Sequence, residues 1–197
     1  EYIRKLVDVF REVRRVLTND GTLWVNIGDS YTSGNRKWRD VDRKNPARGM
    51  DYRPPTPDGL KPKDLIGVPW RLAFALQNDG WYLRSDIIWF KPNCQPESVK
   101  DRPTRSHEYL FLLSKDKKYH YNYTSILEET ETEGRYRNKR TVWAINTEPN
   151  PWNHFAMFPE SLVEPCLLAG SDEGDVVLDP FCGSGTVGVV ALKLRRK

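Results

Sequence analysis

The stretch from residue 176 to residue 186, Val-Val-Leu-Asp-Pro-Phe-Cys-Gly-Ser-Gly-Thr, carries the residues best suited to chemistry. Its three apolar residues predict a buried parallel strand, and Asp179 follows at the carboxyl end of that strand. In open α/β sheets, ligands bind at this end. Gly183 and Gly185 let the backbone approach a ligand closely, and a helix-like apolar run follows them. We therefore expect a ligand site in which the Asp179 carboxylate meets a cationic or hydroxyl-bearing group.

The same two glycines, together with Gly188, also satisfy the Gly-x-Gly-x-x-Gly pattern of dinucleotide-binding folds. The acidic residue that would support that pattern, about 20 positions further on, would lie beyond Lys197. A carboxylate directly before the turn also disfavours a diphosphate, which prefers backbone N–H groups and a helix N-terminus. A phosphate-binding Walker loop is not indicated, because no lysine precedes Thr186. An NAD-dependent oxidoreductase and a tight turn without a ligand stay as alternatives.

Helical and strand-like patterns alternate along the chain, which is typical of an α/β sheet. Helices are predicted near residues 3–17, 65–76 and 159–168, and strands near residues 22–27, 81–90, 107–113 and 141–145. Residues 118–123 are expected to pair with residues 107–113 as a hairpin. Residues 32–63 form a polar segment with almost no apolar periodicity, and such long loops are usually functional or disordered. Both ends of the sequence fall within helical patterns, so we expect a piece of a longer protein.

Composition limits the classes of function. The chain has 197 residues, a formal net charge of +4 and a pI near 8.9, which suits one domain and is compatible with a polyanionic partner. Three widely spaced cysteines predict neither a disulfide framework nor a zinc site, and the histidines lack metal-ligand spacing. No apolar run is long enough to cross a membrane, and no signal peptide is visible. We expect a cytoplasmic protein of bacterial, archaeal or phage type, without a metal.

The motif Asp-Pro-Phe-x-Gly-x-Gly-Thr resembles the S-adenosylmethionine (SAM) loop of the β-class DNA amino-methyltransferases. Residues 21–31, 65–93, 106–113 and 154–162 resemble other segments of that family, and they follow one another in its order. The resemblance implies an α/β, Rossmann-like methyltransferase fold with a mostly parallel sheet and a permuted, β-class motif order. It divides the chain into a catalytic side at residues 1–123 with a polar insertion at 32–63, a candidate target-recognition region at 124–153, and a SAM-binding half at 154–197.

The resemblance also implies SAM as the cofactor. Asp179 is expected to face the methionine ammonium, Phe181 to pack against the cofactor, and Phe158 and Pro159 to flank the methionine end. The full set of expected cofactor-binding residues is Asp179, Pro180, Phe181, Cys182, Gly183, Ser184, Gly185, Thr186, Phe158 and Pro159.

The implied reaction is methyl transfer from SAM to N4 of cytosine or N6 of adenine in a flipped DNA base. The family's catalytic tetrapeptide, Asp/Ser/Asn-Pro-Pro followed by an aromatic residue, is absent, since residues 53–56 read Arg-Pro-Pro-Thr. We therefore assign no catalytic residue and expect the chain alone to be inactive, with a missing N-terminal segment or second chain supplying the motif. Asp29 and Tyr31 are cleft candidates, and a capping turn is an equal alternative for both. The sequence also leaves open whether the protein forms a homodimer.

Two basic stretches are candidates for contact with double-stranded DNA. Such runs bind phosphates and give salt-dependent affinity without sequence choice. The residues are Arg36, Lys37, Arg39, Arg43 and Lys44 in one stretch and Arg135, Arg137, Lys139 and Arg140 in the other.

Two rival functions remain at this point: a non-catalytic DNA-binding remnant of a methyltransferase, and a methyltransferase that acts on RNA or protein. The Pro165-Cys166 pair is similar to that of cytosine-C5 methyltransferases, but it precedes the SAM loop instead of following it. We therefore predict that Cys166 is a small buried hydrophobic residue and not a nucleophile.

Overall fold

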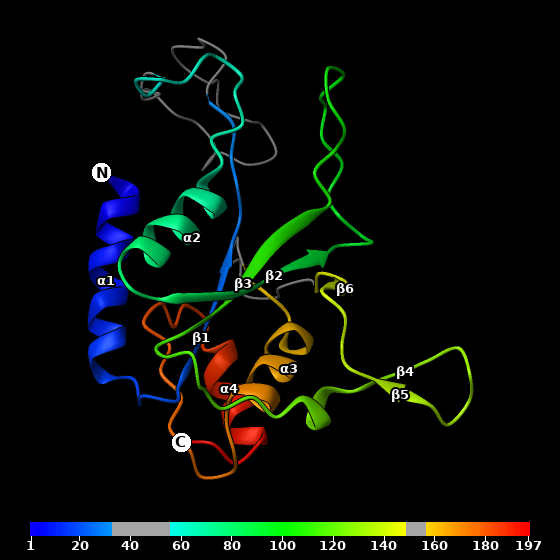
Figure 1. Cartoon of the computed structure of the whole chain (residues 1–197). Coiled ribbons are helices and arrows are strands. Elements are labelled where there is room, and N and C mark those ends of the chain that lie inside the picture. The colour runs from blue at the N-terminus through cyan, green and yellow to red at the C-terminus, as the bar shows by residue number, and fades with distance from the viewer. Residues whose placement is uncertain (33–55, 149–156) are drawn as a thin grey trace.

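A four-stranded sheet lies at the centre of the described part of the molecule (Figure 1). The computed structural model describes residues 1–32, 56–148 and 157–197. The strands are β1 (Thr22–Ile27), β2 (Tyr82–Phe90), β3 (His107–Ser114) and β6 (Val142–Ala144), in the order β1-β3-β2-β6. Strand β3 runs antiparallel to both β1 and β2, while β6 runs parallel to β2.

The expected mostly parallel sheet is therefore a mixed sheet in the described part of the chain. The reason lies in the connection between β2 and β3. Residues 91–106 contain no helix, and a parallel return would need a crossover, which is usually helical. The chain instead turns back beside β2 as an antiparallel neighbour, which leaves β1 and β2 parallel to each other on either side of β3.

Helices cover both faces of this sheet, as the alternation of strand side chains requires. On one face, α1 (Tyr2–Val16) and α2 (Val68–Asn78) bury Phe10 and Leu72 against Leu23 and Phe111. On the other face, α3 (Glu160–Gly170) joins a second cluster. That cluster contains Ile87, Trp89, Leu110, Trp143, Leu162 and Cys166. Helix α4 (Thr186–Lys193) packs against α3 in a third cluster.

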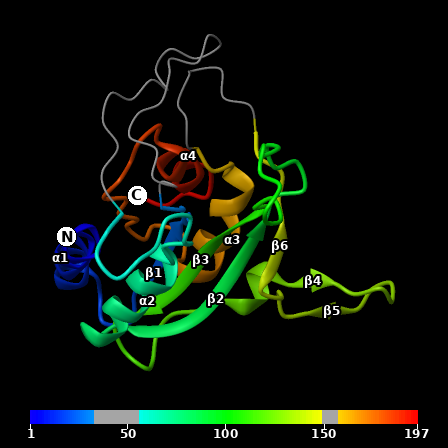
Figure 2. The same ribbon diagram turned by 90° about the horizontal axis from the view of Figure 1, so that it is seen from above.

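Two predicted strands are wrong, and both errors concern pairing. Residues 118–122 do not form a hairpin with β3; their backbone bonds elsewhere, with His120 N donating to Asp20 O and Asn122 N donating to Ala169 O, both at 2.8 Å. The 3₁₀ helix η2 (Tyr123–Ile126) follows, and then a separate hairpin of β4 (Glu128–Glu129) and β5 (Tyr136–Arg137). This hairpin projects from the body of the molecule in both views (Figures 1 and 2).

Residues 176–178 are the second case, because they do not form a buried strand. Val176 and Leu178 are 79% and 57% exposed, and Val177 alone of the three packs against the third cluster. The backbone nevertheless begins a parallel pattern: Lys197 N donates to Asp175 O at 2.7 Å, and Val177 N donates to Lys197 O at 2.8 Å. No strand in the described residues pairs with this segment, so its outward side chains stay uncovered.

Within the described residues, no helix is long and apolar enough to cross a membrane. The same part of the chain contains no cluster of three side chains suited to hold a metal ion.

Candidate functional site

The glycine turn before α4 is an open loop with two left-handed residues. Gly183 has φ +53° and Gly185 has φ +81°, conformations that favour glycine. Gly185 N donates to Cys182 O at 2.8 Å, and Gly185 is also the N-cap of α4. A Cβ added at Gly185 would meet no atom within 4 Å. The turn is thus fixed internally, while the space beside its backbone remains open to a ligand.

One carboxylate oxygen of Asp179 accepts a hydrogen bond from the turn, and the other has no partner in the described part of the chain. Its Oδ1 accepts the backbone N–H of Phe181 at 3.0 Å, which holds the carboxylate at the start of the turn. Its Oδ2 has no hydrogen-bond partner among the described residues. An ammonium or hydroxyl group could therefore bind Asp179 without displacing the contact that shapes the loop.

The predicted aromatic residues beside this turn differ in exposure. Phe181 is 56% exposed, and its ring makes an edge contact with Phe10 of α1 at a centroid distance of 6.0 Å. Phe158 is half-buried and packs against both the second and the third cluster, and Pro159 is buried at the N-terminus of α3. Phe181 thus offers an apolar surface to a ligand, whereas Phe158 and Pro159 join α3 to the core beside it.

Of the remaining turn residues, Pro180, Cys182 and Ser184 are exposed and Thr186 is half-buried. The Ser184 and Thr186 hydroxyl groups lie 3.2 Å apart. These features fit the group expected here: an open glycine backbone, a half-free carboxylate and an exposed aromatic ring suit the ammonium and apolar parts of SAM.

Asp29, by contrast, contacts backbone and side-chain groups that connect several segments of the fold. Its side chain is 3% exposed, and Oδ1 accepts the N–H groups of Ser30 and Val68, each at 2.9 Å. The Oδ2 atom lies 3.7 Å from Arg105 Nη2. Val68 begins α2, so Asp29 ties the end of β1 to the N-terminus of that helix. These contacts favour the capping interpretation over a direct role in a cleft.

Tyr31 lies against Arg102, which is not among the residues predicted from the sequence. The guanidinium of Arg102 is 3.9 Å from the centroid of the Tyr31 ring, and Arg102 Nη1 donates to Glu97 Oε2 at 2.6 Å. That hydrogen bond lowers the pKa of Glu97 below its ordinary value. The contact fastens the β2–β3 connection to the segment after β1.

Lys91 and Glu108 form a second pair that sequence reasoning missed. They make a partly buried ion pair at the carboxyl end of β2, and Lys91 Nζ lies 4.1 Å from the centroid of the Trp89 ring. Gly28 lies beside them, since a Cβ placed there would be 3.5 Å from Glu108 Cδ. Both residues fall inside the segments that resemble the family, but nothing in their spacing pairs them.

The predicted DNA-contacting residues fall into two groups. Arg36, Lys37, Arg39, Arg43 and Lys44 lie outside the described residues. Arg135 lies in the hairpin loop, Arg137 is on β5, and Lys139 and Arg140 follow it, so the structure brings this group together on the projecting hairpin. Arg137 and Arg140 both bond to Glu128, an acid that the sequence analysis did not select.

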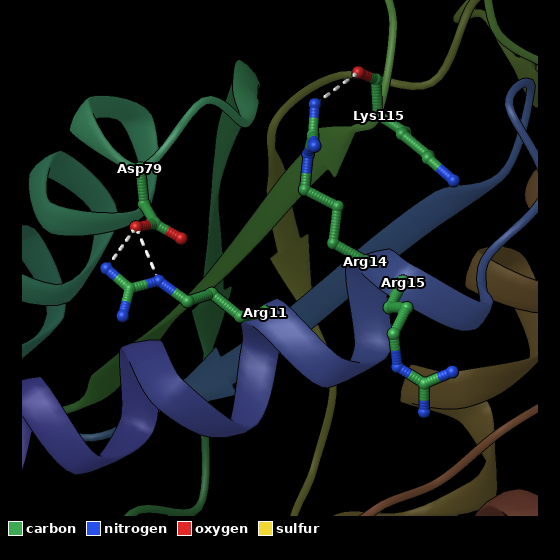
Figure 3. Close-up of a pocket in the computed structure, with 5 residues that line it drawn as sticks. All are labelled: Arg11, Arg14, Arg15, Asp79 and Lys115. Carbon is green, nitrogen blue, oxygen red and sulfur yellow. Dashed lines mark hydrogen bonds and ion pairs between the residues drawn. The ribbon is translucent and has the colours of Figure 1, made fainter.

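A basic hollow of about 390 Å³ lies apart from the glycine turn and is lined by α1, the end of α2 and the residue after β3 (Figure 3). Arg11 binds Asp79, while Arg14 and Lys115 donate to backbone carbonyls at the ends of neighbouring elements. The fifth lining residue, Arg15, pairs with Glu12. Arg11, Arg14 and Lys115 thus link α1 to neighbouring segments, and none of the lining residues belongs to the predicted site.

Comparison with known proteins identifies the family. Residues 1–197 match the N6/N4 methyltransferase family, described as DNA methylase. The chain belongs to this family. It is 69% identical over its whole length to the type II methyltransferase M.SmaI of Serratia marcescens and 65% identical over 96% of its length to M.Cfr9I of Citrobacter freundii. It spans 68% and 63% of those two relatives.

Solved structures share the fold of this DNA methylase family member. The PvuII DNA methyltransferase (cytosine-N4-specific) aligns with the whole chain and with 64% of its own length, at a TM-score of 0.76 and 20% identity. A putative DNA modification methylase from Thermus thermophilus, complexed with SAM, aligns with the whole chain and with 69% of its own length, at 0.64 and 22%. The expected family, the Rossmann-like fold and SAM as the family's cofactor are thereby confirmed, and the oxidoreductase alternative is set aside.

Proposed function

We propose that this chain forms the SAM-binding and target-recognition parts of a DNA methyltransferase that modifies the exocyclic amine of cytosine or adenine. The observation that carries the proposal is the family match over all 197 residues, and the open glycine turn that resembles the family's SAM loop supports it. The identity to the Serratia and Citrobacter methyltransferases supports the same activity.

SAM, when bound, supplies an electrophilic methyl group on a sulfonium. Asp179 Oδ2 would accept a hydrogen bond from the ammonium of SAM, and Phe181 would pack against its apolar surface. The proposed transfer would form a nitrogen–carbon bond at the exocyclic amine and break the sulfur–carbon bond, leaving its electron pair on sulfur, and the amine would release one proton to solvent. No enzyme nucleophile takes part. Cys166 fits this scheme, because burial raises the pKa of its thiol and keeps it protonated.

The Pro-Pro-aromatic tetrapeptide does not occur in these 197 residues. We propose that a further segment or a second chain supplies it, consistent with a chain that spans 63–68% of the relatives above.

We place the protein in the bacterial cytoplasm, where its DNA substrate lies. Analytical ultracentrifugation with and without DNA measures the mass of the species in solution and so tests whether the protein forms a homodimer.

The decisive experiment measures transfer of labelled methyl groups from SAM to duplex DNA, followed by nucleoside analysis for N4-methylcytosine and N6-methyladenine. The chain is assayed alone and with the supplied tetrapeptide segment. We expect label in one of these two nucleosides when the tetrapeptide segment is present. Duplex RNA and histone protein serve as competing substrates. Label in RNA or protein alone would refute the DNA assignment, and binding to DNA without any transfer would favour the non-catalytic remnant.

The cofactor site makes the first prediction. Asp179→Ala removes the acceptor for the ammonium and the bond to Phe181 N, so SAM binding should weaken at least tenfold in titration calorimetry. Glu173→Ala is the matched control, because Glu173 is an exposed acid on the same segment, paired with Arg195. Unchanged affinity in Asp179→Ala would remove this residue from the site.

The hairpin makes the second prediction. Arg137→Ala combined with Arg140→Ala should weaken duplex binding several-fold in an anisotropy titration. Arg15→Ala is the control for Arg140, since both side chains are 68% exposed and both bind a glutamate through Nε, at 2.7 and 2.6 Å. Equal effects of the hairpin variant and the control would take the hairpin out of the DNA interface.

A further inference from the structure

Glu128 holds two arginines on one carboxylate oxygen. Arg137 Nε lies 2.8 Å and Arg140 Nε lies 2.6 Å from Glu128 Oε1. Each guanidinium therefore uses its Nε on the acid. The terminal Nη1 and Nη2 groups of both arginines have no hydrogen-bond partner among the described residues. The result is a pair of planar donor forks, both fixed at one end and free at the other.

The base of this arrangement is anchored in the core from two sides. Glu128 follows η2, whose Ile126 is buried and whose Ser125 Oγ donates to Leu168 O at 2.8 Å. On the other side, Trp143 Nε1 donates to Arg140 O at 2.7 Å, and Trp143 is buried in the main sheet. The two forks thus stand at the stem of a projecting two-stranded ribbon, an element of the size that the DNA major groove admits.

Charge decides between the two DNA groups that an arginine fork can bind. A phosphate placed at these forks would also face the nearby Glu128 carboxylate, and the repulsion would offset part of its attraction. The O6 and N7 atoms of guanine are neutral acceptors spaced for the two terminal nitrogens of an arginine. The Glu128 carboxylate does not repel these neutral atoms as it would repel a phosphate. Because Glu128 already holds both arginine side chains in place, binding to guanine costs less side-chain entropy.

We infer that Arg137 and Arg140 read guanine bases in the target sequence and that Glu128 is the positioning residue that aims both forks. This inference rests on the proposed DNA methyltransferase function and assigns the specificity of that same activity. It separates these two arginines from neighbouring Arg135, which forms no ion pair in the described residues and carries an unrestrained charge.

The test uses charge-conserving variants, because lysine keeps a phosphate contact but loses the fork. Duplexes from a randomised pool are selected by binding to the protein and sequenced, for the wild type and for Arg137→Lys, Arg140→Lys and Glu128→Gln. The expected wild-type target contains guanine at fixed positions. Each lysine variant should lose preference for guanine at its own position by roughly five- to 150-fold, the range for one bidentate pair. Glu128→Gln should weaken the preference at both positions.

Two controls and a second measurement keep the outcomes apart. Arg135→Lys and Glu129→Gln change neighbouring hairpin residues and should leave the selected sequence unchanged. SAM affinity, measured for every variant, reports on the fold without depending on DNA. The salt dependence of binding should keep its slope in the lysine variants.

Uniform weakening across all sequences in Arg137→Ala and Arg140→Ala, with a salt slope lower by about one for each, would assign both arginines to phosphates and overturn the inference. An unchanged guanine preference in the lysine variants would overturn it as well. Failure of the proposed function has a different signature, namely no methyl transfer to any duplex, with or without the tetrapeptide segment.

Discussion

At the scale of single residues, Asp29 shows how one buried carboxylate can organise an edge of a sheet. It accepts two backbone N–H groups and faces Arg105, and these partners come from three separate segments. Sequence position alone places Asp29 at the end of a strand, which is also where a catalytic acid would lie. Two of these partners, Val68 and Arg105, are 39 and 76 positions away along the chain, and their contacts indicate a structural role for Asp29.

Asp29→Ala should therefore lower the free energy of unfolding by about 1–2 kcal/mol, because it leaves the Val68 N–H without its cap and Arg105 without its acid. Urea unfolding followed by circular dichroism measures the effect. Asp8→Ala is the comparison, since Asp8 is an exposed acid that pairs with Arg11 within one helix, and it should change stability by less than about 0.5 kcal/mol. Similar values for the two variants would contradict the anchoring role.

Residue-level prediction worked where a short motif has a fixed geometry. The sequence pattern predicts a glycine-rich turn at 183–185, and the structure has a turn there with left-handed backbone at both glycines. It failed for Lys91 with Glu108 and for Glu128 with its two arginines. Those pairs depend on which strands lie together, and charged residues carry no periodic signal that reveals a partner.

At the scale of elements, the contact between the end of α3 and β1 is close enough to exclude a side chain. A Cβ added at Gly170 would lie 2.5 Å from Thr22 Oγ1 and 2.9 Å from Trp24 Nε1. These two atoms also bond to each other at 3.2 Å. The helix can approach the strand this closely because residue 170 is glycine.

Gly170→Ala should consequently destabilise the protein by about 1–3 kcal/mol, the usual cost of overpacking. Gly188→Ala is a matched helical control, because a Cβ at Gly188 meets nothing within 4 Å. Alanine there should stabilise α4 by roughly 0.5–1 kcal/mol. Thermal melts of both variants give the comparison, and a neutral Gly170→Ala would show that the helix and strand can separate at little cost.

Elements were predictable from apolar periodicity, as α1, α2, β1 and β3 show. Pairing was less predictable. Residues 118–122 have strand-like composition, yet their backbone donates to the turn before β1 and to the end of α3. Residues 176–178 are apolar without a neighbouring strand in the described residues. Periodicity reports which face of a segment is apolar, whereas strand formation also requires a partner backbone.

At the scale of the whole molecule, the three cysteines differ in how deeply they are buried. Cys166 is buried and donates to Leu162 O, Cys94 is half-buried, and Cys182 is exposed in the glycine turn. Burial raises the pKa of Cys166, which further suppresses its reactive thiolate. A thiol reagent therefore reports on the core, an intermediate loop and the proposed cofactor site in one experiment.

In the native protein at pH 8, Cys182 should react with a chromogenic disulfide first, Cys94 more slowly, and Cys166 only after denaturant is added. SAM should slow the reaction of Cys182 and leave Cys94 unaffected. Mass spectrometry of the labelled peptides identifies each site. Fast labelling of Cys166 without denaturant would mean that the second cluster opens readily in solution.

The loop of the projecting hairpin, residues 130–135, belongs to none of the three hydrophobic clusters. Its anchors lie at the stem, in the Trp143–Arg140 and Ser125–Leu168 bonds. Insertions, deletions and substitutions in that loop therefore cost the core almost nothing. The tip can therefore change in length and sequence while the packing of the three clusters stays the same.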